Sequence, residues 1–129
     1  MYKPKMKKEM MCPIEYAIDL CGGKWKTRII CLITSNGIMR YNAIRKELPN
    51  VTDTVLASTL KELISADIVT RKQYNEMPPK VEYLLTEKGE ALKPILHNMC
   101  QWSNTFMEFD RKNALSPCKS CSQLTKADD

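Results

Sequence analysis

Apolar residues recur at every third or fourth position through the first half of the chain, which is typical of amphipathic helices. A first helix is predicted over residues 13–21, because Pro13 suits the first helical position and the glycines at 22 and 23 end the pattern. Its apolar stripe consists of Ile14, Ala17, Ile18 and Cys21. A second helix is predicted to follow, as far as residue 36, with an inner face that consists of Trp25, Ile29, Leu32 and Ile33.

Two further helices are predicted between residues 41 and 66. The first is short, about 41–48, because Pro49 ends it, and Thr52 can N-cap the second, which continues to about residue 66. The apolar side of the second helix consists of Val55, Leu56, Leu60, Leu63 and Ile64. Its other side carries small or hydrogen-bonding side chains and a lysine, namely Asp53, Thr54, Ala57, Ser58 and Lys61. Such a face lets a helix approach another surface closely.

After residue 68 the pattern changes to the alternation that predicts strands, at residues 69–74 and 80–85. The loop NEMPP joins them, and Arg71, Lys72 and Lys80 make this hairpin basic. Residues 38–40 are too few for an independent strand, but they could add an edge to the hairpin.

A single long helix is predicted from residue 87 to about residue 109, capped by Thr86 and bent at Pro94. Its broad apolar face consists of Ile95, Leu96, Met99, Trp102, Phe106 and Met107. This face is wide for a small domain, and a monomer would leave part of it in water. It therefore forms a dimer interface or covers the core of the monomer.

This order of elements predicts an α+β, mainly helical fold. We expect a winged helix-turn-helix domain at residues 12–109, with N- and C-terminal dimerisation helices, the helix-turn-helix at about 41–66, the wing at about 69–85 and the C-terminal helix at about 87–109. Residues 1–11 would form a basic arm and residues 110–129 a polar tail. The second helix of such a pair fits the DNA major groove, and the hairpin reaches flanking backbone or minor groove, unless the same face is merely solvated.

The charge of the 129-residue chain is +5 and uneven. Residues 1–80 contain 14 Lys and Arg against 8 Asp and Glu, whereas residues 81–129 contain 6 against 7. This asymmetry favours a polyanion as partner, although ordinary surface solubility would also explain it. No apolar run approaches the roughly 18 residues that span a bilayer. Because the basic N-terminus also lacks the apolar stretch of a signal peptide, we expect a cytoplasmic protein that does not bind membranes.

Six cysteines occur, and a cytoplasmic location argues against structural disulfides. Cys21 and Cys31 lie in or beside apolar runs, which predicts small buried side chains. Cys118 and Cys121 have zinc-ligand spacing, but one chain offers only this pair. Two chains could share a four-cysteine site, the pair could form a local disulfide, or the thiols could be unused. His97 is far from them in sequence, so we predict no metal site and no cofactor.

Three segments resemble the HxlR-type winged-helix transcription regulators, relatives of the MarR group: CPIEYAIDLCGGKWK, RYNAIRKELPNVTDTVLASTLKELISADIV and PPKVEYLLTEKGEAL. The resemblance covers about residues 12–106. It implies a dimeric, cytoplasmic DNA-binding regulator of bacteria or archaea. Asp67 stands where the family pattern has glycine after the recognition helix, so we expect a slightly different turn there, and the CKSC tail lies outside the pattern.

The resemblance also implies which residues function. The recognition face would consist of Thr52, Asp53, Thr54, Ala57, Ser58 and Lys61, with Arg40 and Asn42 on phosphates and Arg71, Lys72 and Lys80 in the wing. A palindromic operator requires a two-fold protein. The dimer interface would consist of Ile14, Tyr16, Ile95, Met99, Trp102 and Phe106. Asp53 is poorly suited to phosphates, which points to base readout or to rejection of wrong sites.

Cys12 lies at the first turn of the first helix, where free N–H groups and the helix dipole favour a thiolate, although Glu15 opposes it. Some relatives use the cysteine of this motif to sense oxidants or electrophiles, so the resemblance implies this role for Cys12. A thiol that packs beneath its neighbour is the alternative. Three other hypotheses remain. The first is a regulator without thiol sensing, which responds to a small ligand or acts constitutively. The others are a protein-interaction winged helix and a thiol redox enzyme. Catalysis needs a base beside the nucleophile, and one histidine makes an enzyme the weakest hypothesis.

Overall fold

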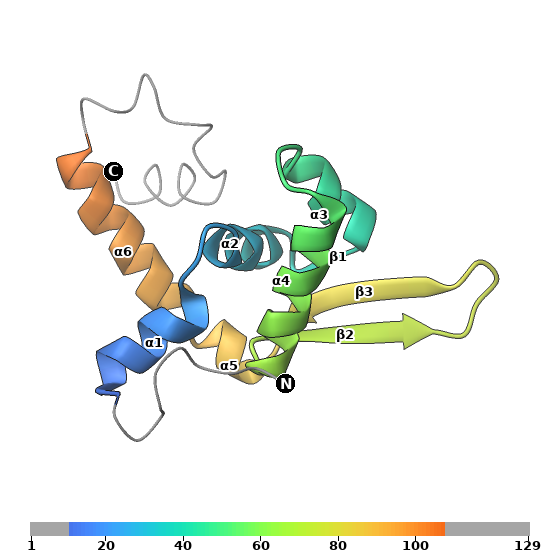
Figure 1. Cartoon of the computed structure of the whole chain (residues 1–129), viewed down its shortest axis with the longest axis horizontal. Coiled ribbons are helices and arrows are strands. Elements are labelled where there is room, and N and C mark those ends of the chain that lie inside the picture. The colour runs from blue at the N-terminus through green and yellow to red at the C-terminus, as the bar shows by residue number, and fades with distance from the viewer. Residues whose placement is uncertain (1–10, 108–129) are drawn as a thin grey trace.

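The computed structural model describes residues 11–107 and contains six helices and three strands in that range (Figure 1). The helices are α1 (Pro13–Cys21), α2 (Lys26–Asn36), α3 (Tyr41–Glu47), α4 (Asp53–Ser65), α5 (Glu87–Glu90) and α6 (Lys93–Phe106). The strands are β1 (Ile38–Met39), β2 (Val69–Tyr74) and β3 (Lys80–Leu85). The predicted fold class is therefore confirmed. Most of the predicted arm and the whole C-terminal tail lie outside the described residues.

A three-stranded antiparallel sheet has the strand order β1–β3–β2. β2 and β3 form the predicted hairpin, with Val69 opposite Leu85 at its base. β1 adds the predicted edge, since Ile38 lies opposite Leu84. Gly37 allows this connection, because its φ of 81° turns the chain from the end of α2 into β1.

The core lies between α2, α3, α4 and the sheet. Its fully buried side chains are Ile29, Ile30, Ile33, Ile44, Leu56, Leu63, Ile68 and Val69. The apolar faces predicted for α2 and α4 need three corrections: Ile30 and Thr59 are buried, whereas Val55 is exposed. Thr59 tolerates burial because its hydroxyl donates a hydrogen bond to the Val55 carbonyl at 2.7 Å.

The prediction of one bent helix from residue 87 to residue 109 is wrong, because two helices occupy this segment. Thr86 caps the first as predicted: its Oγ1 accepts a hydrogen bond from the Gly89 N–H at 3.0 Å. Pro94 lies in the first turn of α6, where its missing N–H leaves no hydrogen bond unmade. The proline therefore begins α6 and does not bend a longer helix.

Asp67 forms the turn between α4 and β2 with a φ of 61°. This is the left-handed region that glycine favours and that aspartate tolerates better than most residues. Aspartate thus adopts a backbone conformation that glycine favours, and the expected difference from the turn of the family pattern stays a prediction.

Candidate nucleic-acid interface

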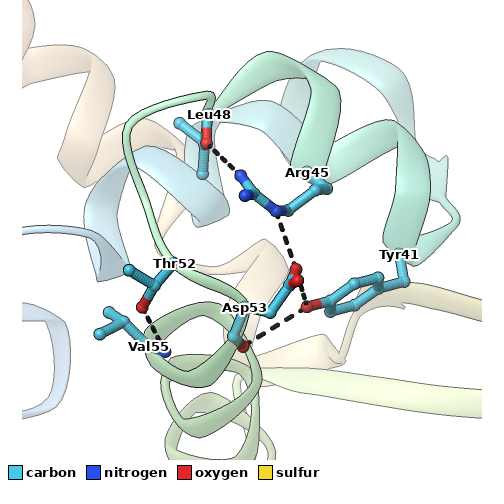
Figure 2. Close-up of polar contacts among 6 residues, drawn as sticks. All are labelled: Tyr41, Arg45, Leu48, Thr52, Asp53 and Val55. Carbon is cyan, nitrogen blue, oxygen red and sulfur yellow. Dashed lines mark hydrogen bonds and ion pairs between the residues drawn. The ribbon is translucent and has the colours of Figure 1, made fainter.

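The predicted recognition face lies on the outside of α4. Exposed side chains make up this face except at Ala57, which is half-buried; they belong to Thr52, Asp53, Thr54, Ser58 and Lys61. On the opposite side, Leu56, Leu60 and Leu63 are buried in the core. Thr52 begins the helix as predicted, since its side chain accepts a hydrogen bond from the Val55 N–H at 3.2 Å (Figure 2). The helical period therefore separates a core side from a polar side that a partner can reach.

Tyr41 and Arg45 of α3 hold the start of α4 through Asp53 (Figure 2). The Arg45 Nε donates a hydrogen bond to the Asp53 Oδ1 at 2.8 Å, and the Tyr41 hydroxyl donates to the same oxygen at 3.1 Å. Arg45 also donates from Nη1 to the Leu48 carbonyl at 3.1 Å. We name Tyr41, Arg45 and Asp53 the α3–α4 clamp. It fixes the first turn of α4 to the preceding helix.

The clamp changes the interpretation of Asp53. Because its carboxylate is paired with Arg45 inside the chain, its negative charge is compensated without a base as partner. Partial burial and, after it, the hydrogen bond to Asp53 raise the pKa of Tyr41. Tyr41 and Arg45 are not among the residues that the sequence predicted to function. Their spacing of four residues on a short helix is the only signal in the sequence that they act together.

The wing presents two exposed cations on β2, Arg71 and Lys72. Arg71 donates a hydrogen bond from Nη1 to the Gln73 Oε1 of the same strand at 3.2 Å. Lys80 differs from both cations, because its contacts reach both strands of the hairpin. Its Nζ lies 3.5 Å from the Glu82 Oε2 and 5.0 Å from the centroid of the Tyr74 ring, which is opposite it in the sheet. A hydrogen bond to Glu82 in turn raises the pKa of Tyr74. Lys80 therefore stiffens the wing, while Arg71 and Lys72 extend into solvent.

The two predicted phosphate ligands before and within α3 are exposed. Arg40 is the N-cap of the helix, and Asn42 lies in its first turn. Arg40 and Asn42 flank the clamp residue Tyr41, so the start of α3 presents exposed polar side chains and also helps to hold α4.

A second surface is apolar and belongs to α1 and α6, the helices at the end of the molecule opposite the wing (Figure 1). Its side chains are 54–69% exposed, although all are large and hydrophobic. They are Ile14 and Ile18 of α1 and Ile95, Met99, Trp102 and Phe106 of α6, which we name the α1/α6 face. α6 contains no buried residue. The alternative that this face covers the core of the monomer is therefore wrong.

Tyr16, which was predicted in the dimer interface, does not belong to this face. It packs against the core, and its hydroxyl accepts a hydrogen bond from the Lys88 Nζ at 3.3 Å. Leu20 is the buried residue of α1, whereas Ile14 and Ile18 are exposed. Positions 14 and 16 point to different sides of a helix, which explains why one faces solvent and the other faces the core.

Cys12 is exposed at the N-cap of α1. The alternative that its thiol packs beneath a neighbouring side chain is therefore wrong. The Glu15 Oε1 accepts a hydrogen bond from the Cys12 backbone N–H at 3.3 Å. Hydrogen bonds from the Cys12 side chain and then from its backbone lower the pKa of Glu15.

Cys21 and Cys31, predicted to be buried, are only half-buried. Burial raises the pKa of the Cys21 thiol, although two nearby lysines oppose this shift.

Residues 11–107 contain no group of three or more His, Cys, Asp and Glu side chains that could hold a metal ion. In the same range no helix is long and apolar enough to cross a membrane. Cys118 and Cys121 lie outside the described residues, so the alternatives for this pair stay predictions.

Known proteins that resemble this chain are transcription regulators. The profile of the HxlR-like helix-turn-helix family matches residues 20–111. The HTH-type transcriptional regulator YkvN of Bacillus subtilis is 43% identical over 101 residues, which are 78% of this chain and 85% of YkvN. The redox regulator HypR in its oxidized form has a TM-score of 0.67 at 40% identity, over 73% of this chain and 96% of HypR. The reduced form of the regulator YodB from Bacillus subtilis also has a TM-score of 0.67, at 39% identity, over 77% of this chain and 97% of YodB.

The family match includes the helix-turn-helix, the wing and α6. The matching family and relatives are regulators and not enzymes, which confirms that the chain is not an enzyme. The chain is a transcription regulator with a DNA-binding helix-turn-helix fold, and it belongs to the HxlR-like helix-turn-helix family.

Proposed function

We propose that this cytoplasmic regulator binds a palindromic operator as a homodimer, with α4 of each subunit in the major groove of double-stranded DNA. The exposed polar side of α4 carries the proposal. Small side chains such as Ala57 and Ser58 let the helix approach base edges, and Thr54 offers hydrogen bonds to them. Lys61 would contact a phosphate beside the groove. Further contacts with phosphates would come from Thr52, Arg40, Asn42, Arg71 and Lys72, with Lys80 as a brace of the wing.

The α1/α6 face supports the homodimer. A monomer would leave its large apolar side chains in water, and burying one such side chain contributes about 1.5–3 kcal/mol. In a two-fold dimer the same patch on both subunits covers itself. Because this face lies opposite the wing, pairing through it leaves the recognition faces open (Figure 1).

A salt titration of DNA binding tests the proposed function. The probe is a labelled duplex that carries the DNA directly upstream of the gene. If roughly six to ten phosphates are neutralised per dimer, the affinity should fall by about a thousandfold or more between about 50 and 200 mM salt. A dissociation constant that ignores ionic strength would contradict DNA binding by this surface.

The clamp predicts that the effect of the Asp53 charge on DNA affinity depends on whether Arg45 is present. Arg45→Met should weaken DNA binding by about fivefold, because its loss leaves the Asp53 carboxylate unpaired and facing phosphates. The effect is small, since a partly exposed ion pair contributes about 1 kcal/mol or less. Adding Asp53→Asn to this variant should restore much of the affinity. Lys46→Met, which removes the same charge from an exposed neighbour, is the control. If the second substitution restores nothing, Arg45 is itself a DNA ligand and the clamp is not its role.

Redox or electrophile sensing by Cys12 is the regulatory part of the proposal. Its exposure at the N-cap of α1 and the resemblance to HypR, a redox regulator, support it. Diamide should change the DNA affinity of the wild-type protein by about tenfold, within the usual range of regulatory coupling. Cys12→Ser should abolish this change, while Cys31→Ser should retain it. A Cys12→Ser protein that still responds would assign the sensing to another cysteine, and a wild-type protein that does not respond would favour a ligand-responsive or constitutive regulator.

A further inference from the structure

One side chain of α5 contacts both the end of α4 and the body of α1. The Lys88 Nζ donates a hydrogen bond to the Ala66 carbonyl at 3.0 Å and another to the Tyr16 hydroxyl at 3.3 Å. The same nitrogen lies 5.6 Å from the centroid of the Tyr16 ring. Ala66 is the C-cap of α4, and Tyr16 lies in the middle of α1. Lys88 is therefore shared between the recognition helix and the N-terminal helix.

The neighbours of Lys88 attach α5 firmly to the residues that follow α4. The Thr86 Oγ1 donates to the carbonyls of Asp67 and Ile68, and the Thr86 N–H donates to the Ile68 carbonyl at 3.0 Å. Gly89 lies so close to the Ile68 carbonyl that a Cβ at this position would clash with it. Contacts on both sides of Lys88 thus fix the backbone from which its side chain reaches α1.

The charge of Lys88 suits this position. The last carbonyls of a helix lack partners within the helix and carry a partial negative charge. The last turn of α4 contains no basic residue, so Lys88 supplies the cation from outside. The face of the Tyr16 ring attracts the same ammonium group. A displacement of Tyr16 would therefore change how the end of α4 is held.

We propose that Lys88 is a positioning residue for DNA binding, which ties the C-terminal end of α4 to α1 so that movement of α1 alters the orientation of α4. The inference rests on the proposed function, because it requires α4 to contact DNA. Tyr16 is one turn after Cys12, whose carbonyl accepts its N–H at 3.1 Å. Ile14 and Ile18 of the α1/α6 face lie on the same helix. Events at the thiol or at the dimer interface would thus reach α4 through Lys88.

The test compares the full-length wild-type protein with Lys88→Met, Lys88→Arg, Tyr16→Phe and the Lys88→Met/Tyr16→Phe double variant. Lys93→Met is the matched control, because Lys93 pairs with Glu90 at 2.6 Å and its loss removes the same charge. On the upstream duplex, Lys88→Met should weaken binding by about fivefold, and the double variant should bind no more weakly than Lys88→Met alone. Lys88→Arg should keep most of the affinity. The salt dependence should not change, since Lys88 contacts no phosphate.

Three results would overturn the proposal. The first is a Lys88→Met protein that binds like Lys93→Met. The second is independent, multiplying effects of Lys88→Met and Tyr16→Phe. The third is a salt slope that falls by about one per Lys88 removed, which would make Lys88 a phosphate ligand.

Hydrogen exchange of the DNA-free protein separates this inference from the proposed function. Tyr16→Phe and Lys88→Met should each speed the exchange of amides at both 16–20 and 64–68, whereas Lys93→Met should not. If the wild-type protein shows no salt-dependent DNA binding, the proposed function fails, and the exchange pattern still decides whether the tie exists. If Lys88→Met does not fold, Tyr16→Phe decides: unchanged exchange at 64–68 would overturn the tie.

Discussion

Trp102→Glu is expected to separate the dimer into monomers and to lower the affinity for a duplex with two half-sites by about a hundredfold or more. Trp102 is 69% exposed in the single chain, and its ring lies 5.4 Å from that of Phe106, between centroids. It would be buried only by a second subunit. Glutamate would then place an unpaired charge on each side of the two-fold axis, which is strongly unfavourable. Without the dimer, each half-site must be bound separately.

Light scattering at micromolar concentration measures the first effect, and a gel shift with the two-half-site duplex measures the second. Trp102→Phe is the control, since it keeps an apolar ring in the α1/α6 face and should stay dimeric. Trp102→Glu should still fold as a monomer, because Trp102 contributes nothing to the buried core. A Trp102→Glu protein that remains dimeric would place the interface elsewhere.

Lys61→Glu should lower the affinity for the same duplex by at least about a hundredfold, because a charge-assisted hydrogen bond worth about 1.5–3 kcal/mol is lost in each of two subunits. Lys61 is exposed on α4, two turns beyond Asp53 on the recognition face. The reversed charge would also repel the polyanion. Losing one phosphate contact per subunit should reduce the salt slope by about 1.8 per dimer.

Fluorescence anisotropy at several salt concentrations measures both quantities. Lys93→Glu makes the same charge reversal at the start of α6, outside the recognition face, and should bind nearly as tightly as the wild-type protein. Equal affinities for the two variants would mean that α4 does not approach the DNA backbone.

The periodicity of the sequence was sufficient to predict the helix-turn-helix and the wing. Burial of Leu56, Leu60 and Leu63 imposes the helical period on α4, and pairing of β3 between two strands imposes alternation on residues 80–85. Capping was equally local, since Thr52 and Thr86 each bond an N–H three residues ahead. Such features depend only on neighbouring residues, which is why a single sequence reveals them.

Features that depend on tertiary contacts were not predictable in the same way. Pro94 fits both a kink within a helix and the first turn of a new one, and the sequence pattern alone does not decide between them. The direction of Tyr16 depends on Lys88, 72 positions away in the sequence. Asp53 and Lys80 appeared to be free charges for DNA, because their partners Arg45 and Glu82 had no assigned role.

Entry of α4 into the major groove from both subunits of a dimer is tested most directly by an NMR titration of the ¹⁵N-labelled protein with the upstream duplex. We predict that the largest amide shifts occur at residues 52–61, with smaller shifts at residues 71–80 of the wing. The amides of α6 should keep their positions, because the dimer interface is already formed without DNA. Shifts concentrated in α6, with residues 52–61 unchanged, would contradict recognition by α4.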